Sequence, residues 1–151
     1  MKTLSLIASG AAVLFSTMAF ADSHADVDPA VTARQAHMQL YAHNLGILGG
    51  MAQGKIDYNP EMAQTAADNF LALANISQAT YWPEGTAEGT KAKPEIWDNM
   101  DDFMSKADDL AFEAEAMADA AGTDLASLQG AMQGLGGTCS ACHREYRIRD
   151  N

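Results

Sequence analysis

Residues 139–143 read Cys-Ser-Ala-Cys-His, so two residues separate the two thiols and an imidazole follows directly. On a helix, positions i, i+3 and i+4 share one face, and all three side chains are expected on one side. This spacing is the attachment signature of c-type haem, whose two vinyl groups form thioethers with the thiols. We predict one haem c per chain, bonded to Cys139 and Cys142, with His143 as the iron ligand.

The cysteine pair fits a disulfide, a thioredoxin-like site or a zinc site less well. A disulfide across so short a loop gains little loop-closure entropy. A thioredoxin-like redox pair needs a βαβ context, which the sequence lacks. A zinc site needs four ligands, and His24, His37 and His43 form no second paired motif. A chance match, or a helical thiol-redox or metal-binding protein without haem, remains as the alternative.

The first residues predict export. Lys2 precedes an apolar run over residues 4–15, and Ala19-Phe20-Ala21 is a small-x-small cleavage site. We therefore expect residues 1–21 to be a signal peptide cleaved after Ala21, and a periplasmic mature protein. Of the 151 residues, 130 then remain at positions 22–151, enough for one domain. No other stretch is long and apolar enough to cross a membrane.

The charge balance restricts the partners. Loss of Lys2 with the signal changes the formal net charge from −11 to −12. So acidic a surface argues against binding nucleic acid or anionic lipid, and it suits small ligands or basic partners. The redox partner is not identified by the sequence.

Apolar spacing and helix-boundary residues predict four helices, at about 28–53, 59–76, 94–121 and 123–146. Four amphipathic helices without a credible strand predict an all-α fold, an antiparallel up-down-up-down four-helix bundle. The segment at about 77–93 is long for a connection and is expected to cover something.

The apolar stripes indicate which residues face the core. The expected inward residues are Val31, Met38, Tyr41, Leu45 and Leu48 on the first helix, Met62, Ala66, Phe70 and Leu73 on the second, Ile96 to Ala121 in steps of three and four on the third, and Leu125, Leu128, Met132, Leu135, Cys139, Cys142 and Tyr146 on the fourth. Both cysteines share the inward stripe, so the group that they hold should face the interior of the bundle.

Three segments together resemble the cytochrome c′ family, the class II c-type cytochromes. They are the C-terminal pattern Cys139-x-x-Cys142-His143-x-x-Tyr146-Arg147, residues 93–97 (Lys-Pro-Glu-Ile-Trp) and Arg34-Gln35-x-x-Met38. The resemblance covers essentially all of residues 22–151. It implies that Cys139 and Cys142 carry the thioethers, that His143 is the proximal ligand, that Arg147 lies by the proximal face and that Arg34 pairs with a haem propionate.

Met38 divides the functional hypotheses. The resemblance places it at the distal position, where an apolar side chain usually crowds the sixth coordination site without bonding iron. We expect high-spin, mainly five-coordinate iron with an apolar distal face, binding NO and CO and/or transferring single electrons. The alternative is a low-spin, six-coordinate electron carrier with Met38 as sixth ligand; His37, off the main stripe, is a weaker candidate.

Two further expectations concern activity and assembly. No general acid, base or nucleophile is placed for turnover, so we do not predict an enzyme. The first helix carries apolar residues outside its inward stripe, Leu40 and Ile47. In line with the family resemblance, they predict an antiparallel homodimer through the first two helices.

Overall fold

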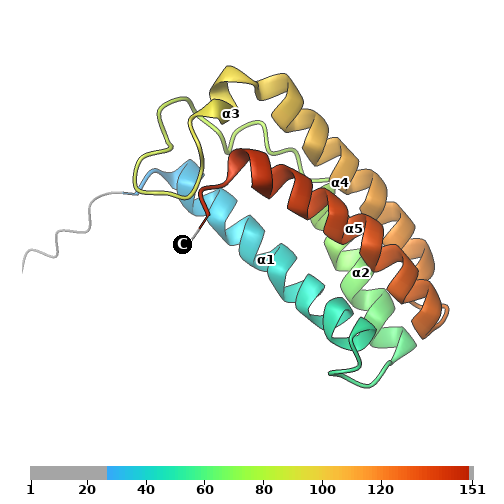
Figure 1. Cartoon of the computed structure of the whole chain (residues 1–151). Coiled ribbons are helices and arrows are strands. Elements are labelled where there is room, and N and C mark those ends of the chain that lie inside the picture. The colour runs from blue at the N-terminus through green and yellow to red at the C-terminus, as the bar shows by residue number, and fades with distance from the viewer. Residues whose placement is uncertain (1–26, 150–151) are drawn as a thin grey trace, which may run out of the picture.

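The computed structural model describes residues 27–149, and within that range the chain forms helices and no strand. The helices are α1 (Pro29–Ala52), α2 (Pro60–Ala74), α3 (Glu95–Asp98), α4 (Met100–Ala120) and α5 (Leu125–Tyr146). The four long helices run alternately up and down, with α1 packed on α2 and α5, and α4 packed on the same two helices (Figure 1). The predicted all-α four-helix bundle is confirmed.

Three of the helix starts follow directly from local side chains. The carboxylate of Asp28 accepts from the backbone N–H of Ala30, Asn59 Oδ1 accepts from Met62, and Asp124 Oδ1 accepts from Ser127. These bonds satisfy N–H groups that the first turn leaves without a helical partner. At the other end of α1, Gly54 adopts a φ of 68°, a left-handed conformation that glycine reaches without a Cβ penalty.

The third predicted helix is interrupted. Asn99 leaves helical geometry with φ −133° and ψ 43°, so a single turn, α3, precedes the long helix α4. The Asn99 side chain and backbone N–H both donate to Glu95 O at 3.1 Å, and Asn99 O accepts from Phe103 N at 2.9 Å. Asparagine side chains compete with helical backbone bonds in this way, which an apolar period of three and four does not reveal.

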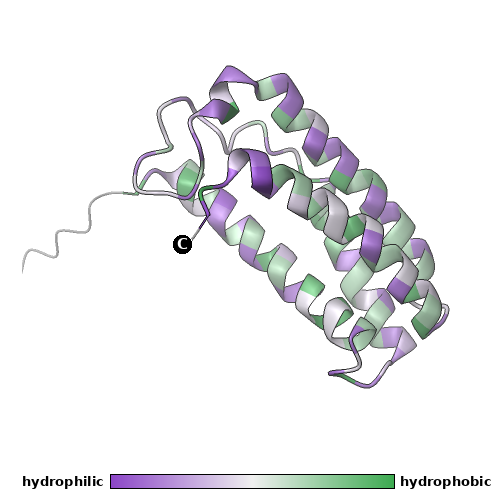
Figure 2. Ribbon diagram, viewed as in Figure 1, coloured by the Kyte–Doolittle hydropathy of each residue, from purple (hydrophilic) through white to green (hydrophobic). Residues whose placement is uncertain are grey.

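The main core occupies the end of the bundle that holds the α1–α2 turn. Large side chains with no exposed surface fill it, and small alanines let the helices approach closely; its members include Leu48, Met51, Ala63, Ala67, Phe70, Ala114, Met117 and Leu128. Hydrophobic and hydrophilic residues alternate along the long helices, as expected for amphipathic helices (Figure 2). A smaller cluster of Ile96, Phe103 and Tyr146 lies beside α3.

Three expected core residues, Met38, Met62 and Leu125, are exposed instead. Met62 is 48% exposed and Leu125 is also exposed. Met62 and Leu125 lie in the first turn of their helices. On α2, Ala63 and Ala67 are buried in addition to the predicted Ala66 and Phe70.

The predicted signal peptide, residues 1–21, lies outside the described residues. Among residues 27–149, no helix is both long enough and apolar enough to span a membrane.

Candidate haem-binding site

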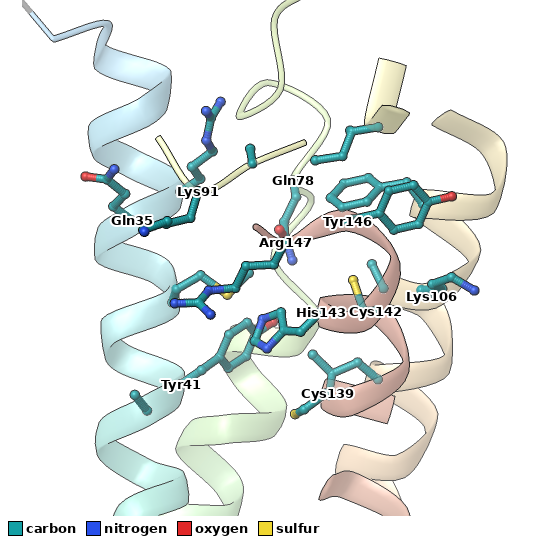
Figure 3. A pocket seen from close by; sticks show the side chains of 18 of the residues that line it. Gln35, Tyr41, Gln78, Lys91, Lys106, Cys139, Cys142, His143, Tyr146 and Arg147 are labelled. Atoms are coloured by element: carbon teal, nitrogen blue, oxygen red, sulfur yellow. The ribbon is translucent and has the colours of Figure 1, made fainter. Parts of the chain in front are cut away.

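A cavity of about 560 Å³ opens at the end of the bundle where the 75–94 connection crosses it. Its volume is in the range of sites for cofactors and drug-sized ligands. The lining is mostly apolar and comes from all five helices and the connection, including Arg34, Met38, Tyr41, Leu45, Phe70, Gln78, Trp82, Ile96, Phe103, Lys106, Leu110, Cys139, Cys142, His143, Tyr146 and Arg147. Figure 3 shows the helices and side chains around it.

The α5 side of the cavity carries the predicted attachment residues. Cys139 and Cys142 are free, half-buried thiols on successive turns, and His143 follows Cys142 on the same side (Figure 3). Burial raises the pKa of both thiols. Burial also lowers the pKa of His143, and the positive charge of Arg147 lowers it further. A lowered pKa favours the neutral form that a metal ligand requires.

Backbone hydrogen bonds fix the connection against the end of α5. Lys93 N donates to Tyr146 O at 3.0 Å, and Ile148 N donates to Lys91 O at 2.8 Å. The Lys93 ammonium donates to Glu145 O at 2.7 Å. These bonds lie just beyond His143 and close that end of the cavity, which gives the long connection the covering role expected from its length.

Arg34 lies in the cavity lining, and its guanidinium N–H groups donate hydrogen bonds to the connection. Its Nη1 donates to Thr86 Oγ1 at 2.7 Å and to Tyr81 O at 3.2 Å, while Nη2 donates to Thr86 O at 2.5 Å. The guanidinium also stacks 4.6 Å from the centre of the Trp82 ring. Arg34 is therefore a buried link between α1 and the connection as well as a positive charge at the cavity.

Met38 is more exposed, and His37 more buried, than the apolar stripe of α1 predicted. Met38 lines the cavity as expected, and it is 37% exposed. His37, placed off the main stripe, is only 4% exposed and packs edge-on against Tyr41 and Tyr81. The buried stripe of α1 includes polar positions, Arg34, His37 and Asn44, which a count of apolar residues overlooks. His43 is exposed.

Three buried polar atoms of residues 27–149 have no hydrogen-bond partner: His37 Nε2, Tyr41 Oη and Trp82 Nε1. All three lie at the cavity end of the bundle, and Tyr41 and Trp82 line the cavity itself. Trp82 packs edge-on against Phe103, and its carbonyl accepts from Trp97 Nε1 at 3.0 Å. Unpaired buried polar groups are rare in native proteins. Their concentration here indicates that the cavity is built to hold a further group.

On the α4 side, the Asp102 carboxylate takes part in a hydrogen bond and in an ion pair. Tyr146 Oη donates to Asp102 at 2.5 Å, and the Lys106 ammonium lies 3.3 Å from the same carboxylate. The bond to Asp102 is the main cause that raises the pKa of Tyr146 to about 12. The sequence did not predict the bond between Tyr146 and Asp102, because these residues lie 44 positions apart on different helices.

The donor set fits a haem better than a bare ion. In the described range, no group of three or more His, Cys, Asp and Glu residues is arranged to hold a metal. The two thiols and one imidazole instead line a largely apolar cavity of cofactor size. That combination suits a flat apolar ring tethered by two thioethers, with one protein ligand to its iron.

Comparisons with known proteins agree with this site. The family described as Cytochrome C′ matches residues 29–147. A cytochrome c-554 from Cereibacter sphaeroides is 42% identical over 91% of this chain and 92% of its own length. The solved cytochrome c′ from Rhodobacter Spheriodes is 30% identical, with a TM-score of 0.79 over 83% of this chain and 99% of that one.

A further solved relative is a ferrous variant of cytochrome c′ from Alcaligenes xylosoxidans with bound NO. It is 29% identical, with a TM-score of 0.71 over 80% of this chain and 94% of that chain. The family match spans most of the sequence and includes the cavity and the Cys-x-x-Cys-His segment. The chain therefore belongs to the cytochrome c′ family of c-type haem proteins, whose cofactor is covalently attached haem c.

Proposed function

We propose that the chain is a periplasmic haem protein in which thioethers from Cys139 and Cys142 hold one haem c and His143 is the proximal ligand. The observation that carries the proposal is the convergence of these three side chains on one side of an apolar cavity. When bound, haem supplies an iron centre for one-electron transfer and for binding small ligands.

The surrounding cations have separate parts in this proposal. Arg147, next to the cavity, disfavours a second proton on His143 and so keeps its nitrogen available. Arg34 places a planar positive charge in the cavity lining, suited to a haem carboxylate, while its Nη atoms hold the connection. Neither residue is a general acid or base, and we propose a binding or electron-transfer role rather than catalysis.

The α1 side of the cavity decides what the iron does. Cys139, Cys142 and His143 are on α5, so α1, across the cavity, faces the side opposite the proximal ligand. Met38, Leu45 and Phe70 make much of that side apolar. We propose a high-spin, mainly five-coordinate iron whose sixth position takes small uncharged diatomics such as NO and CO. The solved relative with bound NO supports this choice.

Carbon monoxide tests the proposal directly. The reduced holoprotein should bind one CO per chain, seen as a saturable change in the haem absorption spectrum. Failure of the spectrum to change at saturating CO would contradict an open sixth position.

A second candidate is the low-spin electron carrier with Met38 as sixth ligand. Met38 is the soft sulfur donor in the α1 lining, and thioethers ligate haem iron in electron-transfer cytochromes. The 42% identical relative is named cytochrome c-554 rather than cytochrome c′, so both kinds of name occur among the relatives. The alternative predicts a closed sixth position and weak CO binding.

Assembly and export complete the proposal. Leu40 on α1 is 52% exposed and lies one turn from His43 and Asn44, which border a groove shared with Met62 of α2. Ile47, expected to point outward, is half-buried and packs on the core, so Leu40 and Met62 carry the apolar surface. We propose an antiparallel homodimer through α1 and α2.

The proposal of export is based on the Ala19-Phe20-Ala21 cleavage site. N-terminal sequencing of the mature protein tests it, and we expect the mature chain to begin at Asp22.

A further inference from the structure

The hydroxyl of Tyr41 is the buried polar group whose position bears most directly on the cavity. Tyr41 belongs to the lining, and its Oη has no hydrogen-bond partner among the described residues. A buried hydroxyl without a partner loses its hydration without compensation. Its natural partner is therefore a group that enters the cavity.

Packing fixes the direction of the Tyr41 ring. The ring lies 4.6 Å from the His37 ring and 4.7 Å from the Phe70 ring, measured between centroids, and Tyr41 is buried. Figure 3 shows the side chain extending from α1 across the cavity toward His143. Because the ring cannot swing to solvent without losing this packing, the hydroxyl stays at the cavity.

The neighbouring histidine does not use this hydroxyl. His37 Nε2 could accept a hydrogen bond, yet it too is without a partner, so the two groups are not bonded to each other. Tyr146, which also lines the cavity, differs because its hydroxyl is already donated to Asp102. Of the tyrosine hydroxyls on α1 and α5, that of Tyr41 is thus the one available as a donor.

We propose that Tyr41 is the hydrogen-bond donor of the distal side: its hydroxyl donates to the outer atom of a small diatomic held opposite His143. The inference rests on the proposed function and deepens it. Tyr41 follows Met38 by three residues, so the two share one face of α1 across from the α5 ligands. In this proposal the distal side is apolar except for one donor.

A donor at this position changes both bond strength and residence time of the ligand. Hydrogen bonding to the outer atom of CO draws electron density from the iron and lowers the C–O stretching frequency. Replacing Tyr41 with Phe should therefore raise that frequency in the reduced CO complex. It should also speed ligand dissociation by about two- to tenfold, the range expected for loss of one neutral hydrogen bond.

Two matched variants isolate the donor. Tyr58→Phe removes a hydroxyl that donates to Ala121 O at 2.9 Å, away from the cavity, and Tyr146→Phe removes a cavity-lining hydroxyl that is bonded to Asp102. Tyr58→Phe should leave the C–O frequency unchanged, whereas any shift in Tyr146→Phe reports the loss of the bond to Asp102. The thermal stability of ligand-free Tyr41→Phe holoprotein should be unchanged or raised, since no existing bond is lost.

The same measurements in a Met38→Ala background separate this inference from the proposed function. Failure of the parent protein to bind CO counts against the open site, and the Met38→Ala parent then supplies the CO complex. In whichever parent binds CO, a higher frequency on adding Tyr41→Phe supports the donor. An unchanged frequency, or a loss of ligand-free stability that points to a bond with the protein or haem instead, would overturn it.

Discussion

The two ends of the bundle are built from the same four helices but are packed in opposite ways. At the end away from the 75–94 connection, Leu48, Met51, Met117 and Leu128 have no exposed surface and fill the space between the helices. At the other end the helices enclose the cavity, and every partnerless buried polar atom found in residues 27–149 lies there.

This difference separates stability from function. Close-packed apolar side chains supply the favourable burial that holds the helices together. The cavity end gives up part of that burial and keeps polar groups that have no protein partner, a pattern expected where a cofactor completes the structure. Substitutions at the two ends should therefore have different signatures.

The largest effect is expected from removing the attachment. A Cys139→Ala, Cys142→Ala double variant should lose all covalent haem, because both thioethers depend on these sulfurs. Mass spectrometry under denaturing conditions should show one added haem and no free thiol in the parent protein, and the bare polypeptide in the variant. Ser140→Ala is the control, since it lies between the cysteines and its hydroxyl donates to Gly136 O on its own helix. Covalent haem in the double variant would refute the assignment.

A substitution that creates a cavity in the packed end should lower the free energy of unfolding without changing the surroundings of the haem. Leu128→Ala is expected to lower the free energy of unfolding by about 3–5 kcal/mol, the range for a fully buried leucine. The haem absorption spectrum of the folded protein should stay unchanged. Leu45→Ala, in the cavity lining, is the comparison: it should alter CO binding more and stability less. Equal effects of both changes on the haem would erase the distinction between the ends.

Arg34 tests how the cavity end is held closed. Arg34→Met removes three hydrogen bonds to Tyr81 and Thr86 and should cost about 1–3 kcal/mol through the unpaired acceptors left behind. Amide hydrogen exchange should rise in residues 77–93. Arg34→Lys keeps the charge but not the planar fork. It should loosen the connection, but it should shift the reduction potential of the haem less than Arg34→Met does. No change in exchange for either variant would contradict the linking role.

The smallest effect on the fold is expected at the outer face. Leu40→Glu should weaken the proposed dimer by burying a charge in its interface, leaving the monomer intact. Sedimentation at micromolar concentration measures it, with Phe112→Glu as the control because Phe112 is 70% exposed on α4, outside the proposed interface. A parent protein that is monomeric at this concentration would disprove the dimer.

The sequence was most informative where spacing alone carries the chemistry. Cys139, Cys142 and His143 could be placed on one side of the last helix, since i, i+3 and i+4 positions must share a face. The four long helices were predictable from apolar periodicity. The break at Asn99 was not, because it depends on one side chain bonding its local backbone.

The α1 side of the cavity was harder to predict for a physical reason. Its buried residues include Arg34 and His37, which periodicity counts as polar and therefore as outward. The importance of Tyr41 lies in a missing hydrogen bond, which only the surrounding structure reveals. Whether Met38 approaches iron depends on a distance across two helices, and apolar spacing carries no such information.

The spin state of the ferric protein is the most direct test of the proposed open sixth position. Electron paramagnetic resonance and absorption spectra of the parent and of Met38→Ala should both be high-spin, with faster CO binding in the variant because a side chain no longer crowds the site. A low-spin spectrum in the parent that becomes high-spin in Met38→Ala would contradict the open position and establish Met38 as the sixth ligand.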